Sequence, residues 1–171
     1  MTYLLLVRHA DAVPLGENGA TTDFDRALSE HGVEQAKALA AALTERGIVP
    51  DVVATSPLLR AVQTAEPLRE LLNPDAHRYV ISERLSPGEL RPRKLAEELL
   101  ATEGRLIAAV GHNDHISQFA AWLLGAPEGS IDLKKGAAML IAFPDGIAKA
   151  GGTVEWLVTP KWYLAGVLEP A

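Results

Sequence analysis

The run Tyr3-Leu4-Leu5-Leu6-Val7, followed at once by Arg8-His9, decides how the rest of the sequence is interpreted. A continuous apolar run of this length is typical of a strand that is buried on both faces. Such strands occur in parallel sheets that are covered by helices on both sides. The run therefore predicts a central parallel strand with two ionisable side chains at its carboxyl end.

Strand and helix patterns alternate along the remainder of the 171 residues. Ser29 is expected to cap a helix that ends at Gly47, and Pro57 is expected to open the next helix. The core side of the first helix is expected to include Val33, Ala36, Leu39, Ala40 and Leu43. The expected strands are residues 3–7, 51–55, 78–82, 106–110, 137–143 and 153–158, and the expected helices are residues 29–46, 57–72, 90–101 (or from 94) and 114–124. This alternation predicts one α/β domain over residues 1–171, a three-layer α/β/α sandwich with a mostly parallel sheet. The last two strands follow each other without a helix, so they are expected to pair antiparallel at one edge.

The composition narrows the class of protein. It is 48% hydrophobic and 22% charged with a net charge of −6, as in an ordinary folded domain without a basic face, so nucleic acid is not an expected partner. There is no cysteine, which excludes thiolate nucleophiles, disulfides and Cys-based metal sites. No segment has the roughly 18 apolar residues of a membrane span and the first residues lack the features of a signal peptide, so no membrane contact and a cytoplasmic location are expected. The oligomeric state is left open.

Polar side chains follow each of the first four predicted strands. They are Arg8 and His9 after the first, Ser56, Pro57 and Arg60 after the second, Glu83 after the third, and Gly111 and His112 after the fourth. Open parallel sheets bind their ligands beyond the carboxyl ends of the strands. Two arginines, two histidines and a carboxylate are therefore expected at one edge of the sheet.

This set of side chains suits phosphoryl transfer. The guanidinium groups of Arg8 and Arg60 match phosphate oxygens and neutralise their charge. A neutral imidazole is a competent nucleophile near pH 7, which is the role expected of His9. His112 is expected to donate to phosphate oxygens, and Glu83 to protonate the leaving atom and later to deprotonate water.

Three segments resemble the signatures of a known family. They are residues 6–10 (Leu-Val-Arg-His-Ala), residues 55–65 (Thr-Ser-Pro-Leu-Leu-Arg-Ala-Val-Gln-Thr-Ala) and residues 110–113 (Val-Gly-His-Asn). In this order they resemble the histidine phosphatase superfamily, the phosphoglycerate-mutase-like enzymes, although Ala10 stands where glycine is usual. The resemblance implies a phosphohistidine intermediate on His9, without a metal ion or another cofactor.

Residues 23–32 are similar to a segment that the short bacterial phosphohistidine phosphatases carry before their first helix. Only one helix fits between Glu83 and Leu106, where relatives with small substrates usually insert a helical cap. An uncapped site suits a phosphorylated protein, for example a histidine-phosphotransfer domain in signal transduction. A small phosphoester remains the alternative substrate, with phosphatase or mutase activity.

Several roles stay open at this stage. The general acid is either Glu83 or Asp23, and Arg26 either makes a third positive contact or pairs with Asp23 or Asp25. The candidate substrate-binding residues are Asp23, Arg26, Asn113 and Ser56, and Ser56 has helix capping as its alternative role. His115 either lines the pocket or has a structural role.

Two other classes of function compete with a phosphatase. His9-Ala10-Asp11 and the segment from His112 to His115 superficially resemble metal-ligand spacings, but two arginines beside a divalent cation would repel it. A non-catalytic phosphate-binding module is the third class. The presence of both histidines and both arginines disfavours it.

Overall fold

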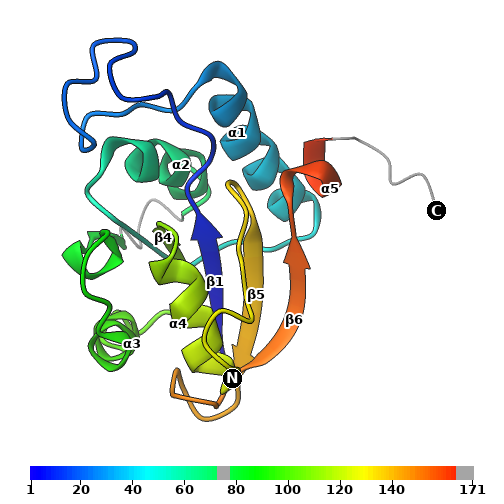
Figure 1. Ribbon diagram of the computed structural model, residues 1–171. Coiled ribbons are helices and arrows are strands. Elements are labelled where there is room, and N and C mark those ends of the chain that lie inside the picture. The colour runs from blue at the N-terminus through cyan, green and yellow to red at the C-terminus, as the bar shows by residue number, and fades with distance from the viewer. Residues whose placement is uncertain (73–77, 165–171) are drawn as a thin grey trace.

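A six-stranded sheet forms the middle layer of the computed structural model, which describes residues 1–72 and 78–164 (Figure 1). The strands are β1 (Thr2–Arg8), β2 (Val52–Thr55), β3 (Tyr79–Ile81), β4 (Leu106–Gly111), β5 (Ala138–Phe143) and β6 (Thr153–Val158). Their order is β3-β2-β4-β1-β5-β6. The pairs β2–β3, β2–β4 and β1–β4 are parallel, whereas β5 is antiparallel to both β1 and β6. The predicted mostly parallel sheet with an antiparallel edge is thus confirmed.

Helices cover both faces of this sheet. The helices are α1 (Glu30–Glu45), α2 (Leu59–Arg69), α3 (Pro92–Leu100), α4 (His115–Leu124) and α5 (Pro160–Leu164), and a 3₁₀ turn, η1, spans Glu83–Leu85. Along β1, Leu4 and Leu6 pack with α3 and α4, whereas Leu5 and Val7 pack with α1 and α2. Each buried leucine or valine contributes about 1.5–3 kcal/mol of transfer free energy. The two apolar layers explain why the buried part of β1, from Leu4 to Val7, is entirely apolar, and the predicted α/β/α sandwich is confirmed.

The first helix begins as its sequence indicates, and it buries Ala36, Leu39, Ala40 and Leu43 as predicted, but not Val33. The Oγ of Ser29 accepts a hydrogen bond from the Gly32 N–H at 3.0 Å, which confirms the predicted N-cap. A Cβ at Gly32 would lie 1.9 Å from the carbonyl oxygen of Asp11, so the loop after β1 packs directly on this turn of the helix. Val33 lies about 100° further round the helix. It is 37% exposed, and the prediction that it belongs to the core is wrong.

The second helix begins at Leu59 and not at Pro57. The Oγ of Ser56 accepts a hydrogen bond from the Leu58 N–H at 3.3 Å, which holds residues 56–58 in a non-helical turn. The N-cap is Leu58, and no side chain caps the helix, so the capping role considered for Ser56 is wrong. The sequence pattern also missed η1 and α5. Within residues 1–72 and 78–164, no helix combines the length and the apolar character that a membrane crossing needs.

Candidate active site

The two histidines lie at the ends of neighbouring strands. β1 and β4 run parallel with Arg8 paired to Gly111, and the His9 N–H donates to the Gly111 carbonyl oxygen at 2.9 Å. One residue further along each strand, the rings of His9 and His112 lie with their centroids 5.0 Å apart. Both are buried, with 7% and 2% of their surface exposed. The strand register therefore brings together two imidazoles that are more than a hundred residues apart in sequence.

The contacts of His9 define its tautomer. Its Nδ1 lies 2.7 Å from the Ala10 carbonyl oxygen, and because a carbonyl can only accept, Nδ1 carries the proton. The other nitrogen, Nε2, has a lone pair and accepts a hydrogen bond from Arg60 Nε at 3.3 Å. Burial lowers the pKa of His9 to about 4, assisted by the positive charges of Arg60, Arg8 and Lys135 and opposed by the bond to Ala10. His9 is thus neutral near pH 7 and presents Nε2 as a base or a nucleophile.

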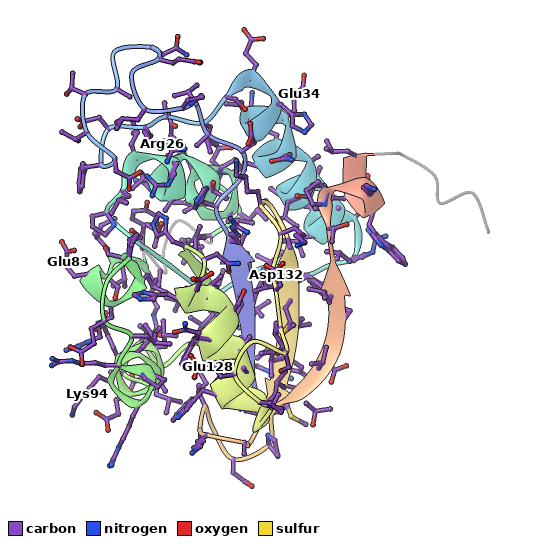
Figure 2. The ribbon with its side chains drawn as sticks, viewed as in Figure 1. Arg26, Glu34, Glu83, Lys94, Glu128 and Asp132 are labelled. Carbon is purple, nitrogen blue, oxygen red and sulfur yellow. The ribbon has the colours of Figure 1, made fainter. Side chains whose placement is uncertain are left out.

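The guanidinium group of Arg60 is held in place by the loop that follows β1. Arg60 is 4% exposed; its Nη1 donates to the Asp23 carbonyl oxygen at 2.6 Å and its Nη2 to Asp23 Oδ2 at 2.9 Å. Asp23 Oδ1 accepts from Arg26 Nη1 at 2.9 Å, and Arg26 Nε donates to the Val13 carbonyl oxygen at 2.8 Å. Figure 2 shows Arg26 in this region beside α2. Of the alternatives for Arg26, the structure has the pair with Asp23.

The carboxylate of Asp23 is influenced by two opposing effects. Burial acts to raise the pKa of Asp23, but the hydrogen bonds and positive charges of Arg26 and Arg60 outweigh it, and the pKa lies below its ordinary value. The carboxylate form is therefore favoured at neutral pH. In this arrangement Asp23 acts as an acceptor that orients Arg60.

Arg8 reaches the opposite side of the site. Its Nη1 donates to the Leu133 carbonyl oxygen at 2.8 Å, and its buried Nε has no hydrogen-bond partner among the described residues. Burial lowers the pKa of Arg8, and the carboxylates of Asp132 and Asp114 partly oppose that shift. Asp132, labelled in Figure 2, also accepts a hydrogen bond from Asn113 Nδ2 at 3.0 Å. Asn113 therefore ties the loop before β5 to the end of β4.

His112 is bonded through one ring nitrogen only. Its Nε2 lies 2.8 Å from Ser56 Oγ, whereas its buried Nδ1 has no partner among the described residues. Burial lowers the pKa of His112 to about 3, with further lowering by the neighbouring His9 and Arg60. Buried polar atoms are nearly always paired. The unpaired Nε of Arg8 is a donor suited to an anion, and the unpaired Nδ1 of His112 becomes one when it is protonated.

Two other predicted residues lie further from His9 than the sequence suggested. Glu83 is exposed on η1, and its side chain points away from the sheet in Figure 2. Its Oε2 accepts a hydrogen bond from Ser86 Oγ at 3.3 Å, and Ser86 Oγ lies 3.3 Å from Ser56 Oγ. His115 bonds through Nε2 to the Gly88 carbonyl oxygen, which favours the structural role for this histidine.

Sequence reasoning missed Lys135 and Ser86. Lys135 lies near enough to His9 to lower its pKa, and its Nζ donates to Asp11 Oδ1 at 2.7 Å. β5 runs antiparallel to β1, so the residues before β5 lie at the same edge as those after β1. The predicted antiparallel edge was the signal that could have led to Lys135.

The structure is an α/β protein that brings two neutral imidazoles and two guanidinium groups together at one edge of its sheet. No group of three His, Asp or Glu side chains suited to a metal ion occurs among residues 1–72 and 78–164. The description "Histidine phosphatase superfamily (branch 1)" belongs to the family model that matches residues 4–86. Together with the histidine-phosphatase fold, this match confirms the resemblance predicted from the sequence.

Comparisons with individual proteins agree with that family. The chain is 45% identical over 62 residues to a 2,3-bisphosphoglycerate-dependent phosphoglycerate mutase of Leifsonia xyli subsp. xyli, a match that covers 36% of this chain and 25% of that protein. The matched segment thus spans about a quarter of the curated relative.

Solved structures match nearly the whole chain. The protein histidine phosphatase SixA complexed with tungstate is 23% identical with a TM-score of 0.73, covering 93% of this chain and 97% of that one. A phosphoserine phosphatase mutant of Entamoeba histolytica, solved with phosphoserine, is 15% identical with a TM-score of 0.70, covering 94% of this chain and 98% of that one. At these identities the likeness establishes the shared fold.

Proposed function

We propose that this chain is a phosphatase that forms a phosphohistidine intermediate on His9 and removes phosphate from phosphohistidine in a protein. The observation that carries the proposal is the bare Nε2 of His9, which lies beside Arg60 Nε at 3.3 Å and next to the ring of His112. A neutral nucleophile between cationic donors is the arrangement that phosphoryl transfer needs.

In the first step, the hydrogen bond from Arg60 Nε to Nε2 of His9 is given up, Nε2 forms a bond to phosphorus, and the bond from phosphorus to the substrate's leaving nitrogen breaks. Arg8, Arg60 and His112 stabilise the charge on the three phosphoryl oxygens. In the second step, water attacks phosphorus, the bond to Nε2 breaks, and phosphate is released. The Nδ1–H of His9 stays bonded to the Ala10 carbonyl oxygen throughout, which keeps the nucleophilic nitrogen directed at the substrate.

The ionised state of the Asp23 carboxyl group favours a phosphohistidine substrate. The lowered pKa of this carboxyl group makes it a weak proton donor at neutral pH. An alkoxide leaving group needs a proton, whereas the imidazole of a phosphohistidine that is already protonated leaves as a neutral ring. The chemistry available from Asp23 thus suits cleavage of a P–N bond better than cleavage of a P–O bond.

The open surface beside the site favours a protein substrate. Residues 83–106, all of which the structure describes, contain only η1 and α3 before β4 begins. α3 packs against the sheet through Leu95 and Leu99, so it is part of a layer of the sandwich and does not form a cap. A histidine-phosphotransfer domain or a similar phosphorylated protein could present its imidazole at such a site, and a cytoplasmic location would suit that partner.

A small phosphoester is the second candidate substrate. It is favoured by the similarity of a 62-residue segment of the chain to a phosphoglycerate mutase and by the shared fold with a phosphoserine phosphatase. Both substrate classes would bind their phosphoryl group to the same arginines and histidines. Only the groups that contact the remainder of the substrate differ.

The test compares kcat/KM for a phosphohistidine peptide, a histidine-phosphorylated phosphotransfer domain, phosphoserine and phosphoglycerate. We expect the phosphohistidine substrates to be turned over fastest and acid-labile phosphate to be trapped on His9. His9→Ala should abolish turnover and trapping, while removal of the exposed His31 by His31→Ala should change neither. Faster turnover of the small esters would favour the second candidate, and binding without turnover would favour a non-catalytic module.

A further inference from the structure

A chain of hydrogen bonds connects the exposed carboxylate of Glu83 to the buried ring of His112. Glu83 Oε2 lies 3.3 Å from Ser86 Oγ, Ser86 Oγ lies 3.3 Å from Ser56 Oγ, and Ser56 Oγ lies 2.8 Å from His112 Nε2. Ser56 is fully buried with 0% exposure. The chain leads from the surface at η1 to the ring beside His9.

The chemistry of its members gives this chain a direction. A carboxylate can only accept, so the single hydroxyl proton of Ser86 is donated to Glu83. Ser86 Oγ then offers lone pairs only, so Ser56 donates its own proton to Ser86. Ser56 in turn accepts on both of its lone pairs, from the Leu58 N–H at 3.3 Å and from Nε2 of His112.

We infer that Glu83 acts through Ser86 and Ser56 to hold His112 as the tautomer with its proton on Nε2, which leaves Nδ1 free to share a proton with a phosphoryl oxygen. The role of Nδ1 rests on the proposed function, whereas the tautomer does not. Nδ1 is buried without a partner among the described residues, as this arrangement requires. Glu83 is thus a positioning residue for His112, and this role differs from delivering a proton to the leaving group.

The direction of these hydrogen bonds predicts how each substitution changes the tautomer of His112. In Ser86→Ala, the Ser56 hydroxyl becomes free to donate to Nε2, so the other tautomer of His112 becomes accessible. Glu83→Ala removes the acceptor that directs Ser86 and should have the same effect. Glu83→Gln keeps an amide oxygen that accepts from Ser86, so it should preserve the tautomer although it cannot release a proton.

The first measurement is the tautomer of His112 by long-range ¹H–¹⁵N correlation NMR on the full chain at pH 7. We expect a protonated Nε2 and a bare Nδ1 in the wild type and in Glu83→Gln, and a mixture of tautomers in Ser86→Ala. Ser86→Thr should restore the wild-type signals, because threonine keeps the hydroxyl. Unchanged His112 signals in Ser86→Ala would overturn the inference, even if the protein proves to have no phosphatase activity.

The second measurement is kcat on a phosphohistidine peptide. We expect Ser86→Ala and Glu83→Ala each to lower kcat roughly threefold to tenfold, the size of effect of one hydrogen bond, and the double variant to lower it no further. Glu83→Gln should keep most of the wild-type kcat, and Ser130→Ala, at an exposed turn, is the matched control. A loss in Glu83→Gln as large as that in Glu83→Ala, together with a wild-type rate in Ser86→Ala, would instead make Glu83 the proton donor and overturn the positioning role.

Discussion

Lowering the pH from 7 to 5 should destabilise the fold, because both buried imidazoles are held neutral in the native state. The ordinary pKa of 6.5 falls to about 4 for His9 and to about 3 for His112. Between those values and 6.5 the unfolded chain binds more protons than the native protein, so the free energy of unfolding decreases as the pH falls through this window. From these shifts, each imidazole should cost about 2 kcal/mol between pH 7 and pH 5, and the two together up to about 4 kcal/mol. That is a large part of a typical stability of about 5–15 kcal/mol.

The assay is urea unfolding at pH 7 and pH 5, followed by tryptophan fluorescence and extrapolated linearly to water. His112→Gln removes one of the two imidazoles, so its loss between the two pH values should be smaller than that of the wild type by about 2 kcal/mol. His31→Gln removes an imidazole whose side chain is 59% exposed and is the matched control, with the pH dependence of the wild type. The difference between two pH values is taken within each variant, so a change in baseline stability cancels. A wild-type loss below about 1 kcal/mol, or equal losses in the wild type and His112→Gln, would refute the reasoning.

Three further predictions concern the anion site. Arg60→Lys should lower kcat/KM about 100-fold, because an ammonium group cannot replace the fork beside His9, and a rate within about threefold of the wild type would contradict this. Asp23→Ala should lower kcat/KM about tenfold by releasing Arg60, while Asp23→Asn should lower it less because an amide oxygen still accepts from Arg60; equal and severe losses would instead make Asp23 a proton donor. Tungstate at about 100 times its dissociation constant should raise Tm by roughly 5–10 °C in differential scanning fluorimetry, but not in Arg60→Ala; sodium chloride of equal ionic strength is the control.

The sequence was sufficient for the sheet and for the residues at its edge. Apolar runs such as residues 3–7 and 106–110 have one structural solution in a chain of this kind, a buried parallel strand. Once β1 and β4 are neighbours, the register of Arg8 with Gly111 brings His9 and His112 together without any further information. The arrangement of the two rings therefore follows from the strand order, which the structure supplies, while the apolar segments predicted only the strands themselves.

The side-chain network around these rings could not be predicted in the same way. Asp23 lies in an irregular loop that has no periodicity, and its contact with Arg60 depends on how that loop packs over α2. The start of α2 was misplaced because Ser56 bonds the Leu58 N–H, a local contact that competes with the favourable helix-opening position of Pro57. The Asp23–Arg60 bond is tertiary, and no pattern of residue types along the chain reveals it, whereas the Ser56 turn is local and competes with the helix signal of Pro57.

The two imidazoles are neutral chiefly because they are buried, and the nearby arginines add to that effect. Burial is the main cause of the low pKa values of His9 and His112, and the positive charge of Arg60 lowers both values further. A phosphoryl group brings negative charge into the same space and reverses this balance, so it favours protonation of an imidazole nitrogen. In the proposed mechanism, Nε2 of His9 is used in the attack on phosphorus, so Nδ1 of His112 is the nitrogen that would become protonated. Both histidines are therefore neutral in the free site. In the proposed mechanism, the negative charge of the bound phosphoryl group favours protonation of His112, which then becomes a hydrogen-bond donor.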